Sequence, residues 1–485
     1  MRNFFFTFLF LFSFLLSFSQ DFNGYRSGNY TGVNGVFFNP ANIADSRYRW
    51  DFNLFNLSAS FGNNKASYSL KDLGNAINAD SIKNQVFSDK AGPTSGLVSF
   101  VMNGPSILFN LNKKSSIALS TRARAMVNIT DIDGKLANQL INDANNGSDL
   151  PYTIASSQNT VFNINGWTEF GLSYARVLHD DGPNFFKGGI TVKYLAGAAN
   201  AYLNLDKLNT TIDNDAVLDE TYLTNASGKI GLGFGGINTS DFSASDLFKF
   251  KSTGFGGDIG FVYEYRPDSN NTKISETGEY RRDLNKYKFR FGLAILDLGS
   301  ISYKRDLTRS EAYSIHIPNG QRFYLSSLDG LDNFKDTLDQ YPQFFTPDTN
   351  AGSSSYNVSL PTTLQIDADY HLHKSFYISL AAQLALTKNS SKAYNSQYFN
   401  AVALTPRYEG RAFGLYLPLT YSSLTSFNAG LSLRFGPLFL GSGSVLSALL
   451  GNSKQADFHF GLRFGGLQKN KEKKYRKKAQ ADNEE

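Results

Sequence analysis

The sequence predicts an all-β fold, an antiparallel transmembrane β-barrel of about 14 strands, and three observations carry that prediction. Apolar and polar residues alternate with period two in segment after segment from about residue 50 to residue 464. Long and short connections between these segments alternate along the chain. An export-type leader comes first, and the sequence contains no cysteine. Since transmembrane barrels combine alternating strands with long loops at one end and short turns at the other, this class fits best.

The first residues predict a cleaved signal peptide over 1–19. A basic start at Arg2 is followed by a mainly apolar run of fifteen residues from Phe4 to Phe18, and then by Ser19-Gln20. A short basic region, an apolar run and small residues at a cleavage zone are typical of secretory signals. The alternative is an N-terminal membrane anchor, but fifteen residues fall short of the ~20 that a spanning helix needs.

Residues 20–48 do not alternate and predict a plug-like segment ahead of the first strand. Glycines recur with Asn and Tyr, which indicates irregular backbone. The apolar run Val36-Phe37-Phe38 favours packing, because exposed Phe pairs are unfavourable in water. Such a segment could hang in the periplasm or fold into the lumen. The candidate plug motif comprises Phe37, Phe38, Asn39, Pro40 and Ala41.

Residues 49–466 predict the barrel itself. Successive side chains of a strand point to opposite faces, so Leu364, Ile366 and Phe376 are expected to face lipid while Gln365 faces the lumen. The same reading places a set of charges inside, where the acids are expected to pair with the arginines: Arg122, Arg124, Asp367, Asp369, Arg434 and Arg463. The expected strands lie near 50–61, 97–112, 115–130, 165–179, 186–203, 252–266, 286–301, 359–371, 374–388, 399–410, 411–421, 425–436, 437–446 and 456–464.

The connections sort by length. Those at 62–96, 131–164, 204–251 and 302–358 follow expected strands one, three, five and seven, whereas most connections after even strands are short. Outer-membrane barrels have long external loops and short periplasmic turns. The sequence therefore predicts long extracellular loops and both termini in the periplasm.

The last strand and the residues after it differ sharply in character. Phe458, Phe460, Leu462 and Phe464 alternate with polar residues, which resembles the aromatic-ended final strand of outer-membrane barrels. Residues 467–485 follow, and a run of seven Lys/Arg with one Glu occupies Lys469 to Lys478. Such a block repels itself, so a disordered periplasmic tail is expected. It is either simply solvated or attached electrostatically to an acidic partner or to anionic lipid.

Composition argues against catalysis and against nucleic-acid binding. The net charge of +5 is modest and basic residues are scattered through lumen positions. Without cysteine there is no thiolate ligand or nucleophile. His371 and His373 share a strand face, but no third metal ligand can be assigned, and no phosphate loop is present. We expect no enzyme activity, no metal and no cofactor.

Several short motifs occur along the chain. They are Asn39-Pro40-Ala41 with Ala44-Asp45, Lys193-Tyr194-Leu195 with Gly197, Gly254 to Gly260, Gly292 to Gly299, and Leu360-Pro361 with Asp369-Tyr370. These motifs resemble those of FadL-type outer-membrane barrels, a group that includes PorV-like proteins of Bacteroidota. The resemblance implies a 14-stranded barrel with an N-terminal plug in the lumen, in the outer membrane of a Gram-negative, Bacteroidota-like bacterium.

Two functions remain open at this stage. The resemblance, the large loops and the basic tail favour a non-catalytic subunit of a multiprotein envelope machine, for protein secretion or outer-membrane protein assembly. The alternative is a FadL-like passive transporter of hydrophobic small molecules, suggested by Phe37 and Phe38. In either case outer-membrane lipid and lipopolysaccharide would surround the barrel, and the first function also requires other envelope proteins as partners.

Overall fold

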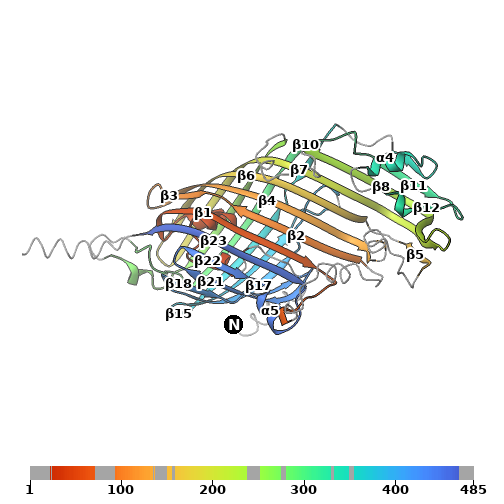
Figure 1. The fold of residues 1–485 in the computed structure, drawn as a ribbon. Coiled ribbons are helices and arrows are strands. Elements are labelled where there is room, and N and C mark those ends of the chain that lie inside the picture. Colours follow the sequence, from red (N-terminus) through yellow and green to blue (C-terminus); the bar gives the residue numbers. More distant parts are fainter. Residues whose placement is uncertain are drawn as a thin grey trace, which may run out of the picture.

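The computed structural model is a closed antiparallel β-barrel of fourteen strands (Figure 1). It describes residues 22, 24–71, 93–134, 136, 150–155, 159–236, 252–274, 280–328, 333–348, 354–390 and 392–468. The predicted signal peptide and the basic tail from Lys469 lie outside these residues. Closure is direct, since β1 (Tyr48–Asn63) pairs with β23 (Gln455–Leu467) over most of their length. The predicted all-β fold class is therefore confirmed.

The barrel strands follow the chain order, each paired with its neighbours. Where two short strands continue one another they form one barrel strand. In order after β1 they are β2 with β3 (Pro93–Asn103, Ser106–Asn110), β4 (Ser115–Asp133), β6 (Asn159–Asp180), β7 (Asn184–Asp215), β9 (Ser252–Tyr265), β10 (Phe289–Lys304), β14 with β15 (Ser355–Ser359, Thr363–His373), β16 (Phe376–Ala385), β17 (Ala401–Glu409), β18 with β19 (Phe413–Tyr416, Leu419–Ser422), β20 with β21 (Ser426–Ala429, Leu431–Phe435), β22 (Leu438–Ser442) and β23.

The outer face of the wall is apolar, as the alternation predicts. In β16 the Leu380 side chain is 37% exposed whereas Gln383 is buried inside. In β23 Phe458 and Phe464 are exposed while Arg463 is buried. Large apolar side chains outside and polar ones inside are what a bilayer-spanning barrel requires. Among the described residues, no helix has the length and apolar character to cross a membrane.

The two ends of the barrel differ. The end we call the turn end carries short connections such as residues 181–183 and 374–375, and β23 finishes there at Leu467. The opposite loop end, on the right in Figure 1, carries an additional small subdomain. It is built from the far half of β7 together with β5 (Tyr152–Ala155), β8 (Glu220–Gly236), β11 (Ala312–Ile317), β12 (Phe323–Tyr324), β13 (Phe345–Pro347), η7 (Leu325–Ser327) and α4 (Phe334–Asp339).

The loop-end subdomain has its own core, which includes Ile212, Leu232, Tyr313, Phe323 and Leu338. The sequence reading treated most of these residues as loops. They form strands instead because β7 continues beyond the barrel wall and β8 pairs back on it. Two further short helices lie outside the subdomain, η6 (Ser269–Thr272) at the turn end and α5 (Val445–Leu450) at the loop end.

The described N-terminal residues lie within the ring of strands, drawn as the red coil in Figure 1. They form three short 3-10 helices, η1 (Tyr25–Ser27), η2 (Gly32–Phe37) and η3 (Pro40–Ile43). Their contacts reach β1, β4, β6, β7 and β9 as well as β21. Because these strands come from opposite sides of the barrel, the segment occupies the turn-end half of the lumen.

Candidate functional site: a lumen closed at two levels

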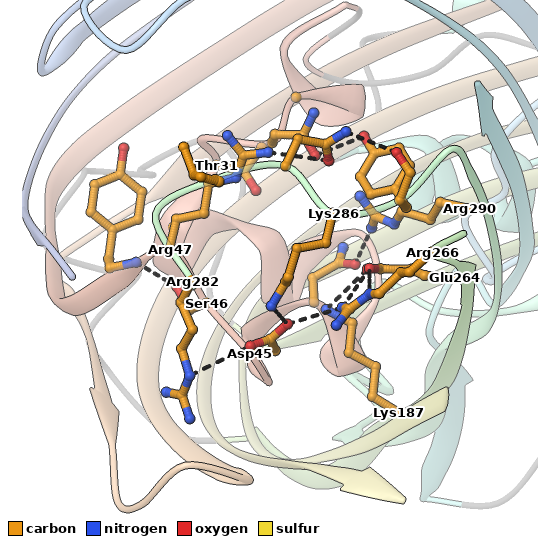
Figure 2. Close-up of a pocket in the computed structure, with 18 residues that line it drawn as sticks. Thr31, Asp45, Ser46, Arg47, Lys187, Glu264, Arg266, Arg282, Lys286 and Arg290 are labelled. Carbon is orange, nitrogen blue, oxygen red and sulfur yellow. Dashed lines mark hydrogen bonds and ion pairs between the residues drawn. The ribbon is translucent and has the colours of Figure 1, made fainter. Parts of the chain in front are cut away.

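The N-terminal segment is fastened at the turn end by Asp45, a single carboxylate among three cations. The Asp45 carboxylate accepts from Lys286 Nζ at 2.6 Å and from Arg266 Nη2 at 2.9 Å, and Arg282 Nε lies 3.5 Å away (Figure 2). Burial acts to raise the pKa of Asp45, but these cations outweigh it and hold the pKa well below its usual range. The carboxylate is therefore charged at neutral pH and anchors the segment electrostatically.

The Asn39-Pro40-Ala41 motif docks the segment against β7, β9 and β10. Asn39 accepts from the Ala41 backbone N–H at 2.9 Å, which caps η3, and its Nδ2 donates to the carbonyls of Phe261 and Leu293. Two wall residues that closely face Asn39 and Pro40 are glycines, which have no side chain. A Cβ at Gly260 would lie 2.2 Å from Asn39 Oδ1, and one at Gly189 would lie 2.5 Å from the Pro40 carbonyl carbon. The two glycines permit this close approach.

Two aromatic residues of the segment lie under arginines, one from the wall and one from the segment itself. The Arg122 guanidinium lies 4.1 Å from the centre of the Phe37 ring, and Arg26 lies 5.2 Å from that of Phe38. Phe22 packs edge-on against Phe38, with ring centres 6.3 Å apart. Cation–π contacts between buried groups contribute on the order of 2 kcal/mol each. The predicted lumen position of Arg122 agrees with this placement.

A network of ionised groups crosses the lumen wall at mid-height. Arg124 in β4 donates to Glu169 in β6, through Nε at 2.7 Å, and its Nη1 donates to Asp297 in β10 at 2.9 Å. Lys193 in β7 lies 2.5 Å from Asp297 and 2.7 Å from Asp258 in β9. Five neighbouring strands are thus joined by charge-assisted hydrogen bonds, all of them buried.

The position of Asp297 depends on a bulge in β10. The pairing of β10 with β9 shifts register between Ile295 and Leu298, and Asp297 has a φ of 62°. Asp tolerates this left-handed conformation better than most residues, and a bulge re-aims a side chain. Here it aims the Asp297 carboxylate at Arg124 and Lys193, while the Asp297 N–H donates to Asp258.

The remaining predicted lumen charges are inside, but with other partners than the sequence suggested. Asp369 binds Arg407, with Nη2–Oδ2 at 2.6 Å, rather than one of the four predicted arginines. Arg463 forms an ion pair with Asp51 and also donates to the Tyr30 carbonyl. These two pairs link strands to each other and to the N-terminal segment.

Arg434 and Asp367 complete the predicted set. Arg434 is buried and donates to backbone carbonyls of the turn after β17, including Gly410 at 2.6 Å. It also lies over the Tyr30 ring. Asp367 is half-buried and faces inward beside Gly292, where a Cβ would meet its carboxylate. Neither takes part in the predicted acid–arginine pairing.

A second closure comes from residues 386–400, which we call the inward loop. Three wall asparagines hold its backbone: Asn128 Nδ2 donates to the Gln397 carbonyl at 2.9 Å, Asn163 to Ala393 at 3.0 Å and Asn200 to Tyr394 at 3.0 Å. The loop also donates a hydrogen bond to the wall, from Ser396 to Asn163 at 2.9 Å. The asparagines sit on β4, β6 and β7, and Asn128 and Asn163 face each other in register. The loop therefore lies across the loop-end half of the lumen.

The two closures meet at a small cavity. It measures about 40 Å³, and Phe22, Phe37 and Phe38 of the N-terminal segment line it opposite Tyr398 of the inward loop. Wall residues with Gln365 and Arg124 among them complete the lining. No described cluster of three or more His, Asp or Glu side chains could hold a metal. The space can take a few water molecules but no passing solute.

Sequence reasoning missed the asparagine triad and four members of the ion network: Glu169, Lys193, Asp258 and Asp297. Asn128 did fall on an expected inward face, so alternation gave a weak signal there. Glu169 and Lys193 also occupy inward positions, but a single strand does not show that Glu169 binds Arg124 or that Lys193 binds Asp258 and Asp297.

Comparisons with known proteins place the chain in a family. Among solved structures, a Pseudomonas aeruginosa FadL homologue is similar with 10% identity over 93% of this chain and 99% of that one, at a TM-score of 0.44. The Ralstonia pickettii toluene transporter TbuX is similar with 10% identity over 90% and 94%, at 0.39, and the Pseudomonas putida toluene transporter TodX with 8% over 93% and 99%, at 0.34. No curated protein matches. These comparisons do not test the predicted PorV-like and Bacteroidota kinship. The model of a family of unknown function, DUF5723, matches residues 40–443, and the chain belongs to that family.

Proposed function

We propose that the protein is an outer-membrane transporter of hydrophobic small molecules whose lumen opens when its two closures move aside. The observation that carries the proposal is the presence of apolar surface inside the lumen. Porin lumens are polar and filled with water. In this barrel, one cluster of buried apolar and aromatic side chains lies in the loop-end half and a second lies around the N-terminal segment. A solute that crosses here would move along these apolar surfaces and past the charged groups that line the cavity between them.

The apolar lining has two parts. In the loop-end half, Trp167, Leu195, Tyr303 and Tyr356 come from four different barrel strands and pack with Tyr398 of the inward loop. Around the N-terminal segment, the lining comprises Phe22, Tyr25, Phe38, Val101 and Phe439. The small cavity joins both parts, since Phe22, Phe38, Val101 and Tyr398 line it together. The side chains of the closures thus occupy the path that an apolar solute would take.

The attachments of the N-terminal segment favour a movable closure. None of its described residues from 24 to 47 belongs to a strand, so its displacement breaks no ladder of the barrel wall. Its anchors are ion pairs and single hydrogen bonds, chiefly those of Asp45 and Asn39. Contacts of this kind can break without unfolding the barrel, whereas lost strand pairing in lipid would leave backbone groups unsatisfied.

A disulfide tether tests the proposal, and the native chain offers a cysteine-free background. A Cβ at Gly260 would lie 2.8 Å from Asn39 Cγ, which places the Cβ atoms of positions 39 and 260 within disulfide reach. Intact Gram-negative cells that produce Asn39→Cys/Gly260→Cys should take up N-phenylnaphthylamine, a hydrophobic fluorescent probe, only after reduction. Each single cysteine variant is the control and should take up the probe in both conditions. Equal uptake by the oxidised and reduced double variant would contradict the proposal.

The subunit of an envelope machine remains the second candidate, and one observation favours it. The loop-end subdomain has its own buried core and extends beyond the barrel wall, which would provide a rigid surface for another protein. Affinity purification of the chain from its native membrane in mild detergent separates the two functions. A stoichiometric partner that is lost when α4 is replaced by a Gly-Ser linker supports the subunit, while a lone barrel supports the transporter.

A further inference from the structure

A cavity at the turn end is lined by more positive than negative charge. It measures about 70 Å³ and lies between the N-terminal segment, the wall and the connection before β10 (Figure 2). Its cations come from all three parts, and among the described residues that line it the carboxylates are those of Asp45 and Glu264. The six cations are Arg47, Lys187, Arg266, Arg282, Lys286 and Arg290.

The carboxylates of Asp45 and Glu264 are too few to form close ion pairs with all six cations. Asp45 and Glu264 are taken by Arg266 and Lys286 at 2.6–2.9 Å, with Arg282 at 3.5 Å. Lys187 lies 3.9 Å from Glu264 and donates instead to a backbone carbonyl. The hydrogen-bond and ring partners of Arg47 and Arg290 are neutral: the amide of Asn285 and the Tyr30 ring for the first, and the amide of Asn42 for the second.

The charged groups just outside the cavity do not remove its excess of positive charge. Asp367, Asp369 and Glu409 are the next carboxylates, and Arg407 lies among them, bound to the last two. Among the described residues, including all four groups still leaves seven cations against five carboxylates. Burial lowers the pKa of Lys286, and the nearby Asp45 carboxylate offsets this only in part. The Arg290 Nε has no hydrogen-bond partner and is buried.

We propose that this cavity binds a small oxyanion, a phosphate group, which fastens the N-terminal segment to the barrel wall. A phosphate offers several acceptor oxygens, and guanidinium groups bind such oxygens in pairs. An oxyanion at this place would accept from Arg290 on the wall, from Arg47 of the segment and from Lys286 before β10. It would neutralise charges that otherwise repel one another at close range.

The test uses the full chain in detergent and inorganic phosphate as the probe, with sodium chloride at the same ionic strength as the reference. The thermal unfolding midpoint should rise with phosphate and saturate, and chloride should not reproduce the rise. Arg290→Gln and Arg47→Gln should each weaken phosphate binding about tenfold or more, because each removes a charged donor. Arg322→Gln at the loop end removes a charge of the same kind and should leave binding unchanged.

A second variant changes the charge in the opposite direction. Asp45→Asn removes a competing carboxylate, so phosphate should bind more tightly to it and should restore more of its lost stability than it adds to the native chain. Dihexanoyl phosphatidic acid distinguishes the sources of phosphate: competition at lower concentration than inorganic phosphate indicates a lipid headgroup, and weaker competition indicates a free phosphate. A rise that chloride reproduces, or one that survives unchanged in both arginine variants, overturns the proposal.

Discussion

Arg124→Met should destabilise the barrel severely, because Arg124 balances buried acids at the centre of the wall. Its side chain is 1% exposed, and it binds Glu169 and Asp297 while it lies over the Trp167 ring at 4.7 Å. Without it, Lys193 would be the one described ion-pair partner left to the carboxylates of Glu169, Asp258 and Asp297. Removing one partner of a buried ion pair costs about 3–5 kcal/mol, since the other partner stays buried and uncompensated.

The assay is reversible urea unfolding in lipid vesicles, followed by tryptophan fluorescence. Trp167 is one of only two tryptophans and touches the substituted side chain, so the signal reports on this part of the wall. The free energy of unfolding should fall by about 3–5 kcal/mol. Arg322→Met, which breaks a more exposed pair with Asp215 at the loop end, should cost less than about 1 kcal/mol.

A compensating change makes the test specific. Asp297→Asn combined with Arg124→Met removes one charge of each sign and should recover part of the loss, because residues of one network are coupled. A loss below about 1 kcal/mol for Arg124→Met alone would refute the reasoning, since that is the range of an exposed pair. No recovery in the double variant would show that lost packing, not unbalanced charge, causes the effect.

Four further predictions follow from single features. Leu380→Arg places a charge in lipid and should cost about 2–4 kcal/mol near the midplane, whereas Gln383→Arg on the inner face of β16 should cost much less; equal loss of heat-modifiable barrel in both would contradict the strand register. Asn163→Ala removes two hydrogen bonds to the inward loop and should make it a site of proteolysis, while Asn209→Ala at the loop end should not. Truncation after Gly466 should leave the barrel inserted, but removal of Phe458 to Phe464 should abolish insertion, because β1 and β22 would lose their partner in lipid; an inserted barrel without that strand would contradict closure. Because the pKa of Asp45 is depressed in the folded chain, its anchoring is fully present above the ordinary carboxyl pKa of about 4 and is lost as the pH falls further, so protease protection of residues 24–44 should be constant from pH 8 to 5 and decline only in stronger acid.

The strand count could be predicted because lipid and lumen impose alternation on every strand that crosses the membrane. Leu380 and Gln383 show the two faces directly, and the last strand behaves likewise. The loop-end subdomain could not be predicted in the same way. Its core, with Ile212 and Phe323 in it, forms by packing between segments distant in sequence, outside the layer where lipid enforces the pattern.

The lumen charges show a similar limit. Alternation placed Asp369 and Arg463 inside, but a single strand does not say which residue lies opposite. Asp369 on β15 meets Arg407 on β17 across the intervening strand β16. The order and register of these three strands bring the two side chains together. The asparagines that hold the inward loop are likewise spread over three strands: pairing places Asn128 opposite Asn163, and Asn200 lies two residues from the partner of Asn163. The need for glycine at positions 189 and 260 becomes clear only in the folded chain, where Asn39 and Pro40 lie against them.

The measurement that tests the central claim most directly is conductance in planar bilayers. The intact chain is compared with three variants: deletion of residues 24–44, replacement of residues 389–398 by a Gly-Ser linker, and both changes together. The N-terminal segment and the inward loop close the lumen at different levels, so the intact chain should not conduct steadily and the combined variant should form a steady pore. Each single variant should conduct less than the combined one. A steady conductance of the intact chain, or a correctly folded combined variant that stays closed, would contradict the account.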